Sequence, residues 1–311
     1  MPFVRLLRPH QWIKNLFVFA GLGFGKQLHD PVAVGITLVG FVCLCLVSSL
    51  VYVVNDIHDR EEDKLHPRKR NRPLASGELS VPAAILLALG LLIVGLGGSW
   101  RLDAGFGAVA TAYLVLQLTY TFGFKHAVIL DVVAIGIGFV LRAVSGAVLV
   151  HVEISPWLVL CTFTLCLFMG FSKRRCELNA LSNGSASAGK HRKTLSLYTP
   201  DLLNHMTTLT AGIAIVSFML YSIDARTKAQ FDTPEAGEFA SQLFLYSLPL
   251  VVYAIFRFAV LVEHGAIDGP TDVVLKDRPF QIAIVLWTVM AMLIVYRAEQ
   301  IRQFLHGAPG T

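Results

Sequence analysis

The chain has 311 residues, of which 55% are hydrophobic and only 15% are charged, and its mean hydropathy is +0.62. This composition excludes an ordinary soluble enzyme and indicates an integral membrane protein. The net charge is +5, but no soluble basic domain is visible in the sequence, so nucleic acid is not an expected partner. We predict an all-α fold, a polytopic membrane bundle of about nine transmembrane helices that forms one domain over residues 1–311.

Nine apolar stretches have about the length that a bilayer-spanning helix requires. The predicted helices cover residues 14–30, 32–55, 81–99, 104–122, 127–149, 154–172, 202–222, 240–262 and 280–297. The first is the weakest, because it is rich in glycine and contains Lys26. No small-residue cleavage site lies between the basic start of the chain and this helix, so we expect no cleavable signal peptide.

The distribution of basic residues predicts the orientation in the membrane. Most of the 26 lysines and arginines fall in segments at one end of the predicted helices. By the positive-inside rule, the N-terminus and the long polar loops face the cytoplasm, and an odd number of helices places the C-terminus outside. We therefore expect a multi-pass protein of the cytoplasmic (inner) membrane whose polar loops, 55–80, 173–201 and 263–280, face the cytoplasm.

The first polar loop opens with an acidic motif, Asn55-Asp56-Ile57-His58-Asp59-Arg60-Glu61-Glu62-Asp63. If the preceding helix continues, Asn55, Asp59 and Asp63 stand at i, i+4 and i+8 on one face, and Asp56 joins the same side. Stacked oxygen ligands of this kind suit Mg²⁺ that carries a phosphate-rich substrate. We predict that these four residues bind Mg²⁺ and are catalytic. The alternative is a solvated, charged helix end.

Basic residues follow the acidic motif and can bind the phosphates that a metal bridges. They are Lys64, Arg68, Lys69, Arg70 and Arg72.

Two charged residues, Asp131 and Arg142, lie within the fifth predicted helix. They share a helix face but are about 16 Å apart along the axis, which is too far for an ion pair. An arginine at mid-membrane costs about 2.5–3.5 kcal/mol on insertion scales, so Arg142 should face the bundle interior or a wet cavity. Hydrogen bonds to backbone carbonyl groups are the structural alternative for Arg142. We expect Asp131 to reach the same cavity as Asp56 and Asp59.

The second and third polar loops add further candidates. Lys173 and Glu177 are four residues apart at the end of the sixth predicted helix, and Arg174 follows Lys173 directly. Basic clusters at helix ends often serve only membrane orientation. Asp272 and Asp277 in the third loop are either caps and counter-charges or contacts to a metal or a sugar.

At Asn55-Asp56-x-x-Asp59-x-x-x-Asp63 the chain resembles the UbiA-type intramembrane prenyltransferase superfamily, over essentially its whole length. The resemblance implies a nine-helix bundle in which two aspartate-rich loops bind Mg²⁺ and an isoprenyl diphosphate. The chain departs from this pattern after the sixth predicted helix, where Ser172-Lys173-Arg174-Arg175-Cys176-Glu177 stands in place of the second aspartate-rich motif. One acidic and one basic motif should hold fewer metal ions and more phosphate, which suits 5-phosphoribosyl 1-diphosphate.

Further motifs are similar to one branch of the superfamily, the decaprenyl-phosphate phosphoribosyltransferases. They are Arg8-Pro9-x-Gln11-Trp12-x-Lys14-Asn15, His66-Pro67-x-Lys69-Arg70-x-Arg72-Pro73, Lys173-Arg174-x-x-Glu177-Leu178, Arg192-Lys193-x-Leu195-x-x-Tyr198-Thr199 and Leu275-x-Asp277-Arg278. The resemblance implies Mg²⁺-dependent transfer of 5-phosphoribose from 5-phosphoribosyl 1-diphosphate to a polyprenyl (decaprenyl-like) phosphate, with release of diphosphate. The product would be a precursor of the lipid-linked arabinose donor used in cell wall biogenesis. The resemblance also implies assembly into homo-oligomers.

In this interpretation, Asp56 and Asp59, supported by Asn55 and Asp63, hold Mg²⁺ on the leaving diphosphate. The ionised lipid phosphate attacks the anomeric carbon from the opposite face, so no general base is required. The remaining phosphates are expected to bind basic residues from several segments: Lys14, Arg68, Lys69, Arg72, Lys173, Arg174, Arg192 and Lys193. The other expected polar site residues are Gln11, Asn15, Asp131, Arg142, Glu177, Tyr198, Asp277 and Arg278.

Two other functions compete with this hypothesis. An aromatic-acceptor prenyltransferase that uses an isoprenyl diphosphate would share the acidic motif, but it would require carboxylates near residues 173–177. A non-catalytic transporter or scaffold for lipid phosphates is the second alternative. Transporters contain broken helices and charges within the membrane, but they commonly show inverted repeats, and none is visible in this sequence.

Overall fold

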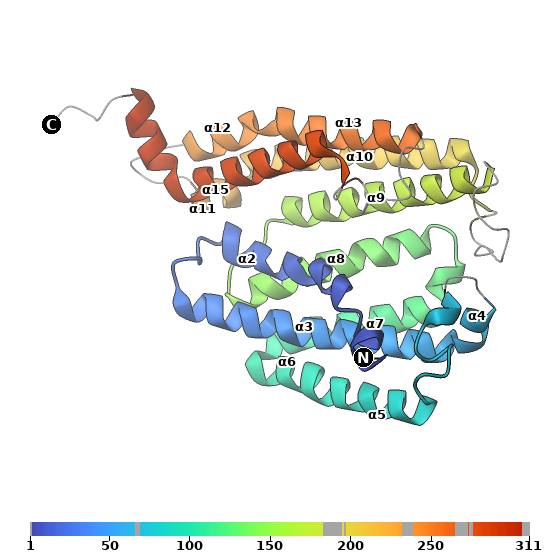
Figure 1. Ribbon diagram of the computed structural model, residues 1–311. Coiled ribbons are helices and arrows are strands. Elements are labelled where there is room, and N and C mark those ends of the chain that lie inside the picture. The colour runs from blue at the N-terminus through green and yellow to red at the C-terminus, as the bar shows by residue number, and fades with distance from the viewer. Residues whose placement is uncertain are drawn as a thin grey trace. The chain divides into compact units, whose positions relative to one another are not determined.

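The computed structural model describes residues 2–65, 69–182, 195, 197–231, 239–264, 273 and 276–306. Every regular element in these ranges is a helix (Figure 1), which confirms the predicted all-α fold. Eight segments of the described chain are helices long and apolar enough to cross a membrane: Pro31–His58, Val81–Leu102, Ala104–Phe122, Leu130–Leu149, Pro156–Asn179, Pro200–Ile223, Phe239–Glu263 and Arg278–Phe304. They match the last eight of the nine predicted helices.

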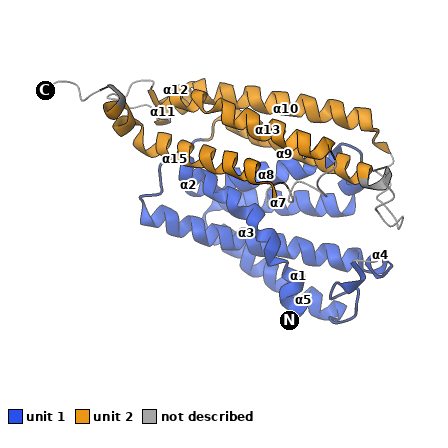
Figure 2. Ribbon diagram, turned by 45° about the horizontal axis from the view of Figure 1, so that its top comes forward, with its two compact units in different colours: residues 1–153, 187–194 blue, residues 154–186, 195–311 orange. Residues whose placement is uncertain are grey.

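The chain divides into two compact units (Figure 2). Unit 1 comprises residues 1–153 and 187–194, and unit 2 comprises residues 154–186 and 195–311. The described elements of unit 1 are α1 (Pro2–Leu7), η1 (Pro9–Val18), α2 (Phe19–Phe24), α3 (Pro31–His58), α4 (Arg60–Lys64), η2 (Lys69–Asn71), α5 (Val81–Leu91), η3 (Leu92–Leu96), α6 (Gly97–Leu102), α7 (Ala104–Phe122), η4 (Phe124–His126) and α8 (Leu130–Leu149). Those of unit 2 are α9 (Pro156–Ser182), α10 (Pro200–Ile223), α11 (Ala225–Phe231), α12 (Phe239–Tyr246), α13 (Leu248–Glu263) and α15 (Arg278–His306).

Each unit has its own apolar core. In unit 1, α3 contacts η1, α5, α7 and α8, and Val47 and Val53 of α3 are completely buried among them. In unit 2, α9 packs along α10 and also contacts α13. Phe168 of α9 meets Phe258 of α13 with ring centroids 5.2 Å apart.

Capping side chains mark the starts of several spanning helices. The carboxylate of Asp30 accepts a hydrogen bond from the Val32 N–H at the start of α3. Ser80, Asp103 and Thr199 cap α5, α7 and α10 in the same way. Because such residues satisfy backbone N–H groups that a helix leaves free, they fix where each helix begins.

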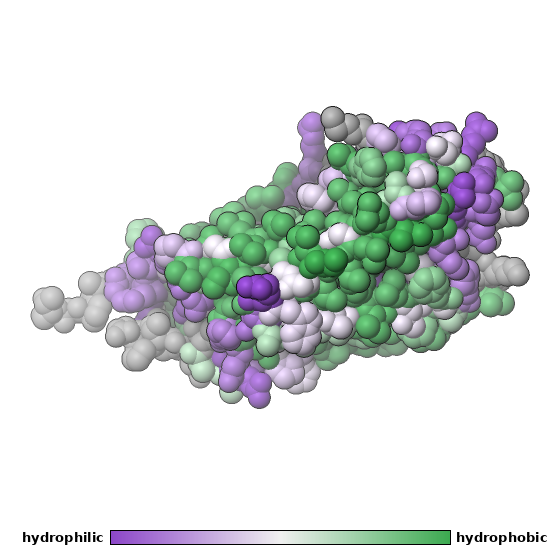
Figure 3. Space-filling model, turned by 90° about the horizontal axis from the view of Figure 1, so that it is seen from below, coloured by the Kyte–Doolittle hydropathy of each residue, from purple (hydrophilic) through white to green (hydrophobic). Residues whose placement is uncertain are grey.

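The surface between the helix ends is apolar. On the face shown in Figure 3, hydrophobic side chains cover the middle and hydrophilic side chains gather toward the two ends. Large aliphatic side chains such as Val32, Leu86 and Ile93 are exposed. In water such an apolar surface would promote aggregation, but it suits contact with the hydrocarbon of a bilayer. These features are those of a multi-pass membrane protein.

The segment predicted as the first spanning helix, 14–30, has a different structure. It lies in η1, a 3₁₀-helix of ten residues, and in α2, an α-helix of six residues, so a single long α-helix is wrong here. Gly21 of α2 packs against the backbone of α8 so closely that an added Cβ would lie 2.5 Å from the Ala147 nitrogen. Because a 3₁₀-helix rises about 2.0 Å per residue and an α-helix about 1.5 Å, the two together would cover about 29 Å if laid in line.

Candidate active site

The acidic motif lies at the end of α3. This helix ends at His58, and Asp59 (φ −87°, ψ 6°) joins it to the short helix α4. The predicted continuous helix is therefore interrupted at Asp59, although the Asp59 and Asp63 N–H groups still donate to the carbonyls four residues earlier, those of Asn55 and Asp59. The structure instead brings Asp56 and Asp63 together through a shared basic partner.

That shared partner is Arg72. Its Nη1 donates to Asp56 Oδ1 at 3.1 Å and to Asp63 Oδ2 at 2.6 Å. Arg8 also donates from Nη2 to Asp56 Oδ1, and the Nζ of Lys69 lies 3.9 Å from Asp63 Oδ1. Only 2% of the surface of Asp56 and of Asp63 is exposed. Arginine and lysine side chains thus contact both buried carboxylates, and these ion pairs offset the cost of burying the charges.

Asp59 has a separate basic partner. The buried Lys125, in η4, donates from Nζ to Asp59 Oδ1 at 2.7 Å. Asn55 is half-buried one turn earlier in α3, and its carbonyl accepts the Asp59 N–H. The four predicted metal ligands therefore lie at one end of unit 1, and each of the three carboxylates contacts a lysine or an arginine.

The donor set at this end fits Mg²⁺ in its chemistry, because Mg²⁺ prefers carboxylate oxygens. In the described chain, however, no three or more His, Cys, Asp or Glu side chains are grouped around one metal position. The oxygen atoms of Asp56, Asp59 and Asp63 face protein cations instead. A metal ion bound here would have to replace contacts made by Arg72 or Lys125.

The N-terminal motif lies along α3, antiparallel to it. Arg8 contacts Asp56, the indole nitrogen of Trp12 donates to Ser49 Oγ at 3.0 Å, and Asn15 donates to Ser48 Oγ at 3.1 Å. Arg8 adopts a left-handed backbone conformation (φ 52°, ψ 59°) directly before a proline. Such a conformation costs about 1–3 kcal/mol in a non-glycine residue, so the contact with Asp56 is made by a strained residue.

Arg142 lies inside unit 1, at the end of this row of polar contacts between η1 and α3. Its Nε donates to Asn15 Oδ1 (2.9 Å), its Nη2 to the Tyr113 hydroxyl (2.6 Å) and its Nη1 to the Gly138 carbonyl (3.1 Å). The guanidinium also lies 4.6 Å from the centroid of the Tyr113 ring and 5.0 Å from that of Phe139. Arg142 is therefore bound by one carbonyl, as the structural alternative predicted, and by two side chains as well.

Asp131 of α8 and two residues of the N-terminal motif, Gln11 and Lys14, are the other predicted site residues of unit 1. Asp131 is fully buried in the first turn of α8, and its Oδ1 accepts the Val132 N–H at 2.9 Å. As its spacing predicts, it is not among the hydrogen-bond partners of Arg142. Gln11 is half-buried and Lys14 is exposed.

In unit 2, the basic motif forms a cluster on α9. Arg174 donates from Nη1 to Glu177 Oε2 at 2.5 Å, and the Nζ of Lys173 lies 3.9 Å from Glu177 Oε1. Arg174 is buried, whereas Lys173 is half exposed. Tyr198 is buried and Arg278 is exposed in the same unit. Glu177 thus pairs with Lys173, four residues earlier, and with Arg174, which is the closer partner.

Asp277 acts as a counter-charge and as a cap. Arg257 donates to both of its oxygens, at 3.2 and 2.7 Å, and Oδ1 also accepts the Phe280 N–H at the start of α15. The hydrogen bond from Arg257 lowers the pKa of the Asp277 carboxyl below its ordinary value. Of the two alternatives predicted for Asp277, the structure shows the cap and counter-charge.

Asp277→Asn should lower the Tm at pH 7, because Asn keeps the cap but removes the charge that Arg257 binds. A carboxyl whose pKa is lowered by folding stabilises the fold above its unfolded pKa of about 3.9 and loses that contribution as the pH falls. The difference in Tm should therefore persist from pH 5 to 8 and shrink below about pH 4. Thermal unfolding of both proteins in detergent would measure it; a constant difference down to pH 3 would contradict this account.

Several predicted residues cannot be placed. Arg68, Arg192, Lys193 and Asp272 lie outside the described residues. Conversely, the structure adds three residues that the sequence did not single out as site residues, namely Arg8, Tyr113 and Lys125. Arg8 belongs to a motif that the sequence does reveal, whereas Lys125 carries no signal beyond a basic charge near a helix end.

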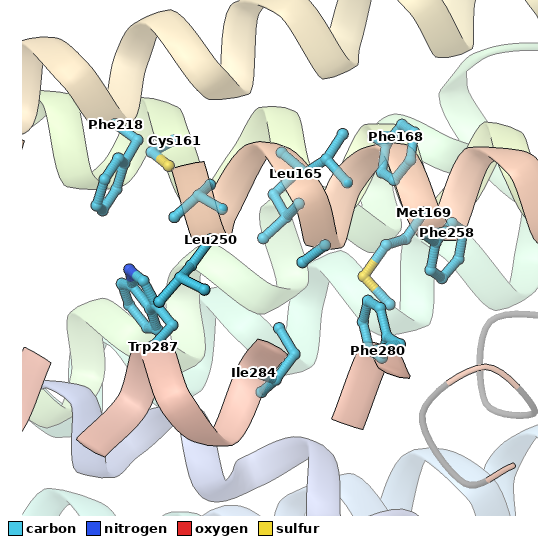
Figure 4. Close-up of a pocket in the computed structure, with 13 residues that line it drawn as sticks. Cys161, Leu165, Phe168, Met169, Phe218, Leu250, Phe258, Phe280, Ile284 and Trp287 are labelled. Carbon is cyan, nitrogen blue, oxygen red and sulfur yellow. The ribbon is translucent and has the colours of Figure 1, made fainter. Parts of the chain in front are cut away.

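Unit 2 also contains an apolar cavity of about 240 Å³ (Figure 4). Phe168, Met169 and Phe258 lie toward one end of it and Phe218 and Trp287 toward the other. Its lining contains no charged side chain, so this cavity offers hydrocarbon contacts and no ligand for a phosphate.

Known proteins are similar to this chain in sequence and in fold. The family model described as the UbiA prenyltransferase family matches residues 15–268. A decaprenyl-phosphate phosphoribosyltransferase of Mycolicibacterium smegmatis is 35% identical over 288 residues, which cover 91% of this chain and 89% of that protein. One from Corynebacterium glutamicum is 33% identical over 297 residues, covering 94% and 86%.

The solved structures agree at the level of the fold. A UbiA homolog from Archaeoglobus fulgidus, solved with DMAPP and Mg²⁺ bound, aligns with a TM-score of 0.69 at 18% identity and covers 95% of this chain and 99% of that one. The family match spans most of the chain, and its curated relatives exceed 30% identity over nearly their full length. This chain therefore belongs to the UbiA prenyltransferase family and is a membrane transferase.

Proposed function

We propose that the chain acts as one domain over residues 1–311 and transfers 5-phosphoribose from 5-phosphoribosyl 1-diphosphate to a polyprenyl phosphate, releasing diphosphate at the cytoplasmic face of the inner membrane. The observation that carries the proposal is the pairing of Asp56, Asp59 and Asp63 with basic side chains. A mixed site of this kind can bind a metal through its acids and phosphate oxygens through its bases. The relatives' name, decaprenyl-phosphate phosphoribosyltransferase, supports transfer of a phosphoribosyl group to a polyprenyl phosphate.

In this proposal, Asp56, Asp59 and Asp63, with Asn55, would hold Mg²⁺. Bound Mg²⁺ would neutralise the diphosphate and make it a better leaving group. Arg72 and Lys125 are already directed at the carboxylates, so they are placed to turn to the phosphate oxygens when these arrive. Strong, charge-assisted hydrogen bonds from these bases would then stabilise the negative charge that the diphosphate gains as the bond to the anomeric carbon breaks.

The attacking group needs no base. A phosphate monoester is largely ionised at neutral pH, with a second pKa of about 6. Lys173 and Arg174 both contact the carboxylate of Glu177 and form a basic cluster on α9. We assign it to one of the remaining phosphate groups of the two substrates.

The test is a transfer assay with purified protein in detergent. Radiolabelled 5-phosphoribosyl 1-diphosphate, a polyprenyl phosphate and Mg²⁺ should give labelled lipid in the organic phase, and EDTA should abolish it. Turnover of an isoprenyl diphosphate with an aromatic acceptor, without labelled lipid, would establish the prenyltransferase alternative instead. No turnover of either donor, with lipid phosphate still bound, would favour a scaffold or transporter.

A further inference from the structure

A cavity of about 490 Å³ lies in unit 1 between α1, the start of η1 and residues 71–73. Three arginines line it, Arg5, Arg8 and Arg72, together with His10. Two of these arginines also contact the acidic motif, since Arg8 and Arg72 both donate to Asp56. The cavity is therefore a basic chamber directly beside the predicted metal ligands.

The charged side chains that line this chamber are all arginines, and contacts with neighbouring groups hold them. Arg5 binds Glu78 through Nη1, at 3.0 Å to Oε2, and its Nη2 donates to the Asn71 carbonyl at 2.6 Å. Arg72 is shared by two carboxylates. The guanidinium groups of Arg5 and Arg8 are held by these contacts at the edge of an open space, so a phosphate can bind them without first ordering two long side chains.

The wall of the chamber continues into an exposed apolar row. Side chains three residues apart eclipse each other along a 3₁₀-helix, and η1 is such a helix for ten residues. His10, at the chamber, is therefore in line with Ile13 and Leu16. These two are 64% and 49% exposed, and the row from His10 to Leu16 extends about 12 Å.

From this arrangement we infer that the chamber binds the phosphate of the lipid acceptor and that the first isoprene units of its chain lie along Ile13 and Leu16. This inference rests on the proposed function and deepens it by placing the acceptor. A soluble phosphate would need only the arginines, whereas a lipid phosphate needs both a basic chamber and an apolar track that begins at it. Arg8 and Arg72 then connect the acceptor phosphate to the acidic motif, where the leaving diphosphate is proposed to bind.

Arg5 provides the sharpest test, because Glu78 is a matched control. Arg5→Gln removes a cation from the chamber, whereas Glu78→Gln breaks the same ion pair and leaves the cation. We expect Arg5→Gln to raise the Kd for decaprenyl phosphate by about 10-fold, as for the loss of one hydrogen bond to a charged group. Glu78→Gln should bind it as tightly as the wild type or more tightly. Arg5→Lys, which keeps the charge, should recover part of the affinity.

Binding of radiolabelled decaprenyl phosphate to purified protein in detergent gives this Kd without any turnover. An equal loss in Arg5→Gln and Glu78→Gln would mean that the ion pair is only structural, and an unchanged Kd in Arg5→Gln would overturn the inference. Displacement by phosphatidylglycerol at equal affinity would assign the chamber to bulk phospholipid instead. If the chain binds decaprenyl phosphate through Arg5 but transfers no phosphoribose, the proposed reaction fails and the chamber stands.

The apolar row has its own control. Ile13→Ser should weaken binding of decaprenyl phosphate and of the short farnesyl phosphate alike, because the first isoprene units of either chain would lie along this row. Val42→Ser makes a similar change at an exposed position of α3 and should affect neither lipid. Unchanged binding of both lipids in Ile13→Ser would show that the chain does not follow η1.

Discussion

Asp56→Asn should reduce phosphoribosyl transfer by about 10²- to 10³-fold, the range found when one preorganised electrostatic contact is lost from an active site. Asp56 is the carboxylate on which two bases converge, because Arg8 and Arg72 both donate to its Oδ1. The amide oxygen of Asn can still accept these hydrogen bonds. The substitution therefore removes a charge and a metal ligand while it keeps the shape of the site.

The matched control is Asp30→Asn. Asp30 lies at the opposite end of α3, where its carboxylate caps the helix by accepting the Val32 N–H at 2.8 Å. Asn is as good a capping residue as Asp, so this variant should retain wild-type activity and Tm. Initial rates of label transfer to lipid, with thermal unfolding in the same detergent, compare the two variants. Activity of Asp56→Asn within tenfold of the wild type would contradict a central role for this carboxylate.

The sequence alone was enough to predict the eight long helices. Each is a stretch of apolar residues of bilayer length, and several begin at a recognisable cap such as Asp30 or Thr199. These signals are local, since apolar length and capping depend on residues only a few positions apart. The prediction of one long helix over segment 14–30 was wrong because the structure there depends on distant residues. Its composition is apolar, but the contact with α8 that shapes η1 and α2 is made by residues far along the chain.

The acidic motif was found from sequence, but its partners were not. Arg8 and Asp56 are 48 residues apart, Lys125 and Asp59 are 66 apart, and Arg142 and Asn15 are 127 apart. No periodicity relates such positions, because they meet only through the packing of separate helices. The turn at Asp59 was also missed, since the i+4 spacing of the motif is equally compatible with one straight helix.

Arg142 shows what a sequence can say about a buried charge. The expectation that it faces the interior of the protein follows from the cost of exposing arginine to hydrocarbon, and it is confirmed. The identity of the groups that bind it depends on how closely η1 approaches α8, and that distance is set by glycine.

Gly146→Ala should lower the Tm, because the backbone of η1 lies directly against this glycine of α8. A Cβ on Gly146 would lie 1.7 Å from the Val18 carbonyl oxygen and 2.6 Å from its carbon. Both atoms belong to the backbone, so η1 or α8 must move as a whole. Overpacking of this kind typically costs about 1–3 kcal/mol. The same movement should also separate Asn15 from Arg142, so activity should fall together with the Tm.

Gly90→Ala is the control, because Gly90 lies in α5 with no atom within 4 Å of an added Cβ. Alanine there should be neutral or stabilise the helix by about 0.5–1 kcal/mol. Gly21→Ala would press on the same helix contact from the other side, 2.5 Å from the Ala147 nitrogen. Once Gly146→Ala has opened that contact, adding Gly21→Ala should cost less than it does alone. Strictly additive losses of Tm would mean that the two glycines do not serve one helix approach, and that Asn15 reaches Arg142 for another reason.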